Sequence, residues 1–182
     1  MADTESLTQR ILHALPSWEG YSYGHKVDFP SCVRGAPTSL VESGTKQIDC
    51  STFTWGLLCQ VYPDADWSFD RYKKWQMWDR DDKWGPITQA LSMEITSKDD
   101  GDGWYLYQVW KGEWRGGHSF LACKAGDDLL VLEATNASRP VPGVVWRYVG
   151  EASTNALPPW PVYTEADATK GYAYSKVKLD GG

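Results

Sequence analysis

The hydrophobic pattern of the first half of the chain predicts helices. In residues 6–15, apolar side chains recur every three to four positions until Pro16, which ends the pattern. A second segment of this kind begins after Asp49, a residue type that caps helices well, and it places Cys50 in the first turn. Residues 16–46, between the two segments, are rich in Gly, Pro and Ser and predict a long loop. The four predicted helices cover residues 6–15, 49–62, 67–78 and 86–95.

The second half of the chain predicts strands. After Gly103, short runs of β-branched, Leu and aromatic residues alternate with clusters of Gly, Asp or Pro. Residues 125–127 lie between two of these runs and predict a hairpin turn. The predicted strands cover residues 104–110, 118–123, 129–133, 144–148 and 172–179. Helices followed by strands predict an α+β fold with an antiparallel sheet.

The length and net charge of the chain exclude several classes of protein. The 182 residues suffice for one full-sized domain, and we expect residues 1–182 to form a single one. The net charge of −6 argues against a binder of nucleic acid or anionic membrane, because both need a basic surface. No apolar run approaches the roughly 18 residues that predict a transmembrane helix. The first ten residues lack the order of a secretory signal, so we expect a cytoplasmic product as synthesised.

The cysteines do not form a recognisable disulfide or zinc pattern. The chain has four, which are too few for a disulfide scaffold and lack paired spacing: Cys32, Cys50, Cys59 and Cys123. We therefore expect four free thiols, mostly small core residues. The acidic runs at residues 79–82 and 99–103 do not match a calcium loop, and with only three histidines we expect no metal and no cofactor.

Cys50 lies where a thiol can act as a nucleophile. It follows Asp49 at a predicted loop-to-helix junction within Ile-Asp-Cys-Ser-Thr-Phe. A thiol attacks as its thiolate, and the free N–H groups and dipole of a helix N-terminus favour negative charge. The same N–H groups can bind the oxyanion that develops when an amide is attacked. Cys50 is therefore the candidate nucleophile, and it needs a base.

His118 is the favoured base among the three histidines. It follows a pair of glycines that leave room for a substrate backbone, and it opens a predicted strand, which is a rigid mount. The predicted hairpin returns Glu133 or a close neighbour to the level of His118, where it can hold the second ring nitrogen; Asn136 is the second candidate for this role. His13 lies in the first predicted helix, away from this constellation. His25 would fit only a circularly permuted arrangement, with too few residues before Cys50 for a sheet.

These motifs resemble the NlpC-type peptidases, papain-like cysteine hydrolases that cut peptide bonds in bacterial cell-wall peptidoglycan. The similarity lies in Asp-Cys-Ser before an aromatic residue, in Gly-His at the start of an apolar strand, and in a polar residue before Ala on the next strand. Upstream, Gly-Tyr-Ser-Tyr-Gly at residues 20–24 resembles the family's tyrosine segment, with Tyr21 the better match to the tyrosine beside the nucleophile. The resemblance spans roughly residues 20–134. Thr52 stands where the family usually has Gly.

The resemblance implies a papain-like fold in which the nucleophile helix packs on the antiparallel sheet. It makes Cys50 the nucleophile, His118 the base and Glu133 the third catalytic residue, where the family more often has His, Asn or Gln. Tyr21 and Ser51 become candidates for positioning the substrate and the oxyanion. The implied activity is hydrolysis of an amide bond in peptidoglycan stem peptides.

Three aromatic or cationic residues are candidates for a substrate groove. Trp55 lies on the predicted nucleophile helix, and Trp114 and Arg115 come shortly before His118. Trp and Arg beside a catalytic dyad suit a glycan–peptide substrate with free carboxylates. Core packing is the competing interpretation, because the chain has 11 Trp and 10 Tyr and such residues most often fill cores.

Three interpretations of the function remain open on the sequence alone, and one of them is an acyl- or amide-transferring relative with a different substrate. An active hydrolase without a secretory signal would reach the wall as a component of a phage tail or a secretion machine, whose proteins would then be its partners. The alternative is a catalytically inactive papain-like module that serves as a structural or binding part of such an assembly.

Overall fold

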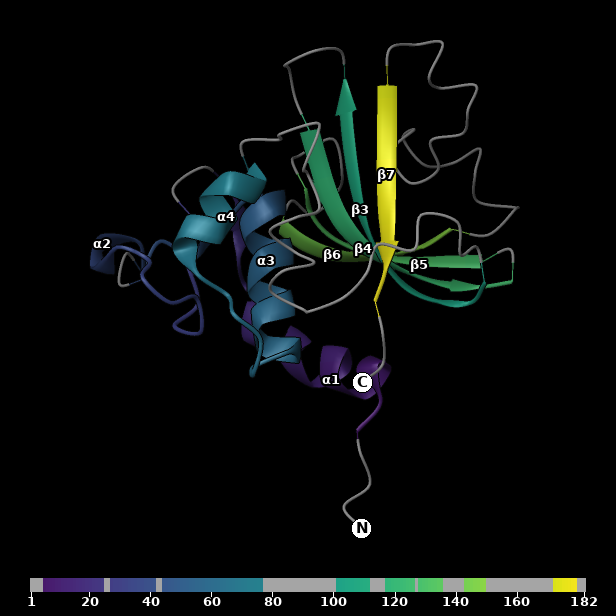
Figure 1. The fold of residues 1–182 in the computed structure, drawn as a ribbon, viewed down its shortest axis with the longest axis horizontal. Helices are drawn as coiled ribbons and strands as arrows, with labels where there is room; N and C mark the ends of the chain where they lie inside the picture. The colour runs from purple at the N-terminus through teal and green to yellow at the C-terminus, as the bar shows by residue number, and fades with distance from the viewer. Residues whose placement is uncertain are drawn as a thin grey trace. The chain divides into compact units, whose positions relative to one another are not determined.

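The computed structural model describes residues 5–24, 27–41, 44–76, 101–111, 117–126, 128–135, 143–149 and 172–179. The chain divides into two compact units. The first comprises Met1–Ile95, Ala134–Val144 and Gly181–Gly182, and the second comprises Thr96–Glu133 and Val145–Asp180. The helices belong to the first unit and most of the sheet to the second (Figure 1).

The first predicted helix is confirmed as α1 (Leu7–Ala14). Ser6 caps it: the Ser6 hydroxyl accepts the amide proton of Gln9, and the Gln9 side chain accepts the amide proton of Ser6 at 2.9 Å. Pro16 does not end the helical path, because the chain continues into a 3₁₀ turn, η1 (Leu15–Trp18), with Pro at a position that needs no N–H donor.

The segment predicted as a long loop contains short elements. A two-residue strand β1 (Ser22–Tyr23) pairs in parallel with β2 (Gln47–Ile48), and one helical turn forms α2 (Thr38–Val41). Elements of two to four residues are too short to leave a periodic hydrophobic pattern, which is why the sequence does not predict them. Their consequence is that β2 delivers the chain directly into the helix that carries Cys50.

The second predicted helix is confirmed as α3 (Cys50–Val61), in which every residue except Gln60 is buried. The helix α1 contacts its C-terminal end, where the Arg10 guanidinium donates to the Val61 carbonyl at 3.2 Å (Figure 1). The third predicted helix is found as α4 (Phe69–Gln76), beside the N-terminal half of α3. The last two residues of that prediction, and the fourth predicted helix at residues 86–95, lie outside the described part of the chain.

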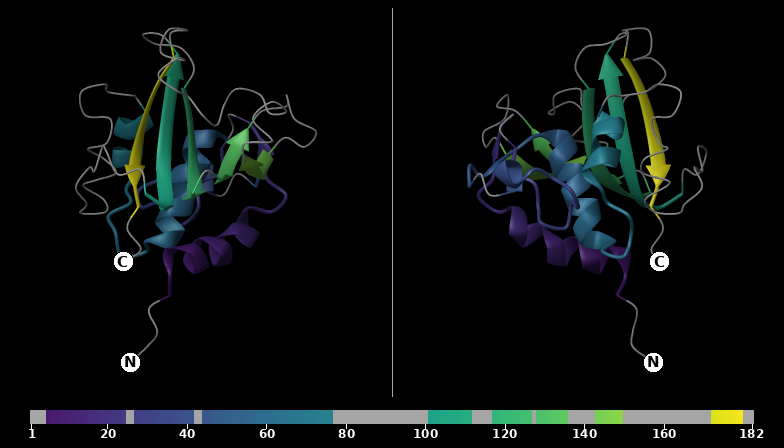
Figure 2. Two further views of the ribbon diagram at one scale, coloured as in Figure 1. Left: turned by 90° about the vertical axis from the view of Figure 1, so that its right-hand side faces the viewer. Right: turned by 60° about the vertical axis from the view of Figure 1, so that its left-hand side comes forward.

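All five predicted strands are present in one sheet. They are β3 (Gly103–Lys111), β4 (Gly117–Ala125), β5 (Asp128–Thr135), β6 (Gly143–Val149) and β7 (Tyr172–Lys178). The strand order is β6-β5-β4-β3-β7, and the four strands β5, β4, β3 and β7 pair antiparallel. Figures 1 and 2 show β3, β4 and β7 side by side. The α+β class and the antiparallel sheet are therefore as predicted from the sequence.

The hairpin between β4 and β5 is also as predicted. Ala125 pairs with Asp128, and Gly126 has a φ of 59°, in the left-handed region that a tight hairpin turn requires. Asp127 lies outside the described residues. This short connection fixes the register between the strands that carry His118 and Glu133.

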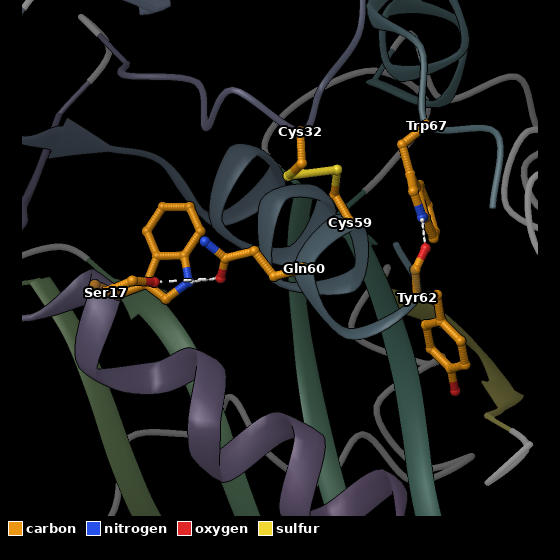
Figure 3. The surroundings of a disulfide bond; sticks show 7 residues. Ser17, Cys32, Cys59, Gln60, Tyr62 and Trp67 are labelled. Carbon is orange, nitrogen blue, oxygen red and sulfur yellow. Dashed lines mark hydrogen bonds between the residues drawn. A yellow bond between two sulfur atoms is a disulfide. The ribbon is translucent and has the colours of Figure 1, made fainter. Parts of the chain in front are cut away.

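The expectation of four free thiols is wrong. Cys32 and Cys59 form a disulfide, with their Cα atoms 6.1 Å apart, and it ties the segment before α2 to the last turn of α3 (Figure 3). The two residues are 27 positions apart, and pairing between distant cysteines cannot be deduced from their spacing. Cys50 and Cys123 are free.

Hydrogen bonds around the disulfide fix the same end of α3. Gln60 accepts from the Trp18 indole at 3.0 Å and from the Ser17 hydroxyl at 3.2 Å, and the Trp67 indole donates to the Tyr62 carbonyl at 2.8 Å (Figure 3). The disulfide is therefore part of a close-packed junction rather than an isolated surface crosslink. No described helix has the length and apolar character needed to cross a membrane.

Candidate active site

Cys50 is the first residue of α3, as the sequence predicts, and only 7% of it is exposed. Asp49 caps the helix: its side-chain Oδ1 accepts the Thr52 amide proton at 2.7 Å, and its carbonyl accepts the Phe53 amide proton at 3.0 Å. The first amides of a helix have no partner within the helix itself. The Cys50 N–H, as one of these first amides, has no hydrogen-bond partner within α3.

Tyr23 lies close enough to Cys50 for their charges to interact. The parallel pairing of β1 with β2 places Tyr23 opposite Ile48, two residues before Cys50. Burial raises the pKa of Tyr23 to about 12, and the negative charges of Cys50 and Asp49 add to the effect. Tyr23 is therefore a protonated hydroxyl, able to donate a hydrogen bond, throughout the neutral pH range.

Tyr21, which the sequence analysis favours as the tyrosine beside the nucleophile, has different surroundings. Its ring contacts Trp18 edge-on at 5.3 Å, and its pKa is raised by burial and then by the charge of Asp28, with no contribution from Cys50. Tyr21 precedes β1, whereas Tyr23 lies on it. Of the two tyrosines, Tyr23 is the one whose pKa responds to the charge of Cys50, and the assignment of Tyr21 stays a prediction.

Ser51 is buried within a hydrogen-bond network. Its Oγ donates to Asp49 Oδ1 at 2.9 Å and lies 3.2 Å from the Tyr72 hydroxyl, which is also 2.8 Å from Thr52 Oγ1. The sequence makes Ser51 a candidate for substrate positioning and gives no indication that Tyr72 and Thr52 belong to the same network. No local signal could have identified Tyr72, because it comes from α4, 20 residues beyond Thr52.

His118 and Glu133 form a buried pair in the second unit. The His118 Nε2 lies 2.7 Å from Glu133 Oε2, and the two side chains are 11% and 1% exposed. The antiparallel pairing of β4 with β5 brings the two strands together, and the Phe120 ring lies against the imidazole with the centroids 5.6 Å apart. The Glu133 carboxylate therefore holds Nε2 of the His118 imidazole.

Of the remaining predicted site residues and alternative bases, the structure describes Trp55 and His13. Trp55 is fully buried, with its ring 4.9 Å from Trp67 and 5.4 Å from Trp75, because α3 is enclosed on almost every side; it is a core residue and not part of a groove. His13 is exposed and pairs with Glu5. The other candidates fall outside the described residues: His25, Trp114, Arg115 and Asn136.

The predicted catalytic residues are divided between the two units. Cys50 belongs to the first unit, whereas His118 and Glu133 belong to the second. The first unit has a thiol at a helix N-terminus, and the second has an imidazole in contact with a carboxylate. Within the described ranges, no group of three or more His, Cys, Asp and Glu side chains could hold a metal ion. Comparisons of the chain with protein-family models, curated proteins and solved structures found no match.

Proposed function

We propose that the chain is a papain-like cysteine peptidase or amidase that hydrolyses an amide bond in peptidoglycan stem peptides. The observation that carries the proposal is the buried contact between His118 Nε2 and Glu133 Oε2, at 2.7 Å. A buried carboxylate that holds one imidazole nitrogen is the arrangement that prepares the other nitrogen for general base catalysis. The substrate class comes from the resemblance of the motifs around Cys50 and His118 to the NlpC-type peptidases.

The proposed reaction begins with proton transfer from the Cys50 thiol to His118 Nδ1. It requires Cys50 Sγ to come within hydrogen-bond reach of that nitrogen. The thiolate attacks the carbonyl carbon of the scissile amide, and the negative charge moves to the carbonyl oxygen. The Cys50 N–H, with the Tyr23 hydroxyl as a second donor, stabilises this oxyanion.

Collapse of the tetrahedral intermediate breaks the C–N bond. The His118 imidazolium gives its proton to the departing nitrogen, so the amine leaves neutral and a thioester remains on Cys50. Water, deprotonated by His118, then hydrolyses the thioester and restores the thiol. Glu133 stabilises the imidazolium in both steps, because its carboxylate lies against Nε2.

The disulfide supports a place of action outside the reducing cytoplasm. Disulfides persist in oxidising environments and are rare where cellular thiol systems keep cysteines reduced. The Cys32–Cys59 bond therefore agrees with a hydrolase that is delivered to the cell wall, as part of a phage tail or a secretion machine.

The experiment that tests the proposed function is digestion of purified peptidoglycan, with products identified by mass spectrometry. We expect the wild type to release stem-peptide fragments and Cys50→Ala to release none. Glu133→Gln should retain the fold and lower kcat about 10- to 100-fold, because a hydrogen bond to a charged group contributes roughly 1.5–3 kcal/mol. The measurement is the initial rate of fragment release at saturating substrate.

Cys123→Ala is the matched control for Cys50→Ala. Cys123 is the other free cysteine, and its pKa is raised by burial and then by the charge of Asp102, which disfavours its thiolate. This variant should digest peptidoglycan at the wild-type rate. If the folded wild type releases no fragment and Cys50 does not react with iodoacetamide, the proposal is wrong, and the inactive structural module becomes the better interpretation.

A further inference from the structure

Three buried hydroxyl groups join α4 to the first turn of the nucleophile helix. The Tyr72 hydroxyl lies 2.8 Å from Thr52 Oγ1 and 3.2 Å from Ser51 Oγ, and Ser51 Oγ donates to Asp49 Oδ1 at 2.9 Å. Tyr72, Ser51 and Thr52 are 3%, 5% and 0% exposed. The contacts thus form a continuous chain that ends on the carboxylate immediately before Cys50.

Counting protons gives this chain a direction. Each hydroxyl has one proton, and Ser51 donates its proton to Asp49 Oδ1. The Tyr72 hydroxyl must therefore donate its proton to Ser51 Oγ, 3.2 Å away, for that contact to be a hydrogen bond. Because the Tyr72 proton is then used, Thr52 Oγ1 must be the donor in its 2.8 Å contact with the Tyr72 hydroxyl. The order is Thr52 to Tyr72 to Ser51 to Asp49. Hydrogen bonds aligned in this way polarise one another and strengthen the last one.

Asp49 has two opposing effects on Cys50. Its side chain caps α3, but it also places a carboxylate on the residue immediately before the nucleophile. Donors on Asp49 Oδ1, the Thr52 N–H at 2.7 Å and the Ser51 hydroxyl, hold the carboxylate in the capping position and withdraw charge from it. The strength of the second donor depends on Tyr72.

Tyr72 is itself held in place by aromatic packing. Its ring meets Phe29 edge-on at 4.8 Å, contacts Trp55 at 5.9 Å, and stacks on Phe69 at 5.9 Å. Its hydroxyl also stays protonated, because burial raises the pKa of Tyr72 and the charge of Asp49 adds to this effect. A rigid, permanently protonated hydroxyl is what a positioning role requires.

We propose that Tyr72 is a positioning residue for the Cys50 nucleophile, which it controls through Ser51 and the Asp49 cap. Without the Tyr72 hydroxyl, Ser51 donates more weakly, the Asp49 carboxylate keeps more charge beside Cys50, and its position is less fixed. The thiolate then forms less readily. The inference deepens the proposed function, on which it rests, and it assigns Ser51 to this chain of hydroxyls rather than to the substrate.

The test measures the reactivity of Cys50 and does not depend on the natural substrate. All variants are made in a Cys123→Ala background, and carbamidomethylation of Cys50 by iodoacetamide at pH 7 is followed by mass spectrometry of its peptide. We expect Tyr72→Phe and Ser51→Ala to slow the reaction about 3- to 10-fold, the equilibrium factor for loss of one hydrogen bond. With peptidoglycan fragments, Tyr72→Phe should lower kcat by a similar factor and leave KM unchanged.

Tyr105→Phe is the matched control. Tyr105 is fully buried in the second unit, and its hydroxyl donates to the Gly101 carbonyl at 2.6 Å, so the variant also loses the donated hydrogen bond of a buried tyrosine. It should leave the alkylation rate of Cys50 unchanged. Circular dichroism checks that each variant folds. If Tyr72→Phe does not fold, the alkylation rate of Ser51→Ala tests the positioning role.

The outcomes separate this inference from the proposed function. Wild-type alkylation rates in folded Tyr72→Phe and Ser51→Ala would overturn the positioning role, even if the wild type digests peptidoglycan. An equal decrease in Tyr105→Phe would also overturn it, because the effect would then be one of general stability. Slower alkylation in the two variants alone supports the role, even if the wild type fails to digest peptidoglycan and the proposed substrate is wrong.

Discussion

Tyr23, which is half-buried, and Tyr72, which is buried, both have a pKa above that of free tyrosine. The pKa of Tyr23 is about 12, and that of Tyr72 is also raised, in both cases mainly by burial. A group whose pKa is higher in the folded state loses its proton first from the unfolded state as the pH rises. The stability that these tyrosines contribute is therefore complete below about pH 10 and is lost progressively as the pH rises above it.

We expect the free energy of unfolding to fall between pH 9.5 and 11.5, and to fall less steeply in Tyr72→Phe. Each tyrosine proton that the folded state keeps and the unfolded state loses lowers the free energy of unfolding by at most about 1.4 kcal/mol per pH unit. Urea titrations at several pH values measure this slope. A Cys50→Ala, Cys123→Ala background removes the free thiols, which would otherwise attack the disulfide at high pH. Identical slopes with and without the Tyr72 hydroxyl would contradict the prediction.

The residues that could be predicted from sequence are those whose chemistry is local. The sequence indicates the position of Cys50 because a helix-capping residue precedes it. It indicates the contact between His118 and Glu133 because a short hairpin fixes the register between their strands. Tyr72 was not found, because its place beside Thr52 depends on how α4 packs on α3. Tyr23 was passed over because the two-residue parallel pairing that brings it near Cys50 has no sequence signal.

Among the elements, α3 depends on a glycine for its packing. A Cβ atom on Gly56 would come within 2.7 Å of Trp18 Cη2 and 3.0 Å of Pro30 Cγ. Gly→Ala in a helix normally stabilises by up to about 1 kcal/mol, but overpacking a core costs roughly 1–3 kcal/mol. We therefore expect Gly56→Ala to lower the free energy of unfolding, as measured by urea denaturation.

A double-mutant cycle with Trp18→Leu tests the physical reason. The leucine removes the ring atoms that the new methyl group would meet, so Gly56→Ala should cost less in the Trp18→Leu background than in the wild type. Additive effects of the two substitutions would mean that contact with the Trp18 ring does not cause the loss.

The regular elements follow the hydrophobic pattern more closely than the connections do. The helix α3 and the strands β3, β4 and β5 match their predicted ranges to within a few residues, since each is long enough to show a period or an apolar run. Within residues 16–46 the hydrophobic pattern does not predict the short elements that the structure contains. There the structure depends on isolated hydrogen bonds, such as those from Thr45 and Lys46 to the buried Asp28 carboxylate.

At the scale of the whole molecule, the Cys32–Cys59 bond links the stability of the fold to the redox conditions around the protein. Cys59 is 1% exposed on the last turn of α3, whereas Cys32 is half-buried, so a reductant can approach the bond from the Cys32 side. The bond closes a loop between residues 27 positions apart, and a crosslink of this length contributes about 3–4 kcal/mol in the chain-entropy model.

Reduction should therefore lower the midpoint of thermal unfolding by several degrees, and the number of free thiols should report where the chain has matured. We expect two reactive thiols per denatured chain when it is recovered from an oxidising compartment or an assembled delivery particle, and four after reduction. A Cys32→Ala, Cys59→Ala variant is the control: its unfolding midpoint should lie below that of the oxidised wild type and should not respond to reductant. Four free thiols in a chain recovered from its place of action would contradict the oxidising location, and an unchanged midpoint on reduction would mean that the bond does not stabilise the junction between α3 and the segment before α2.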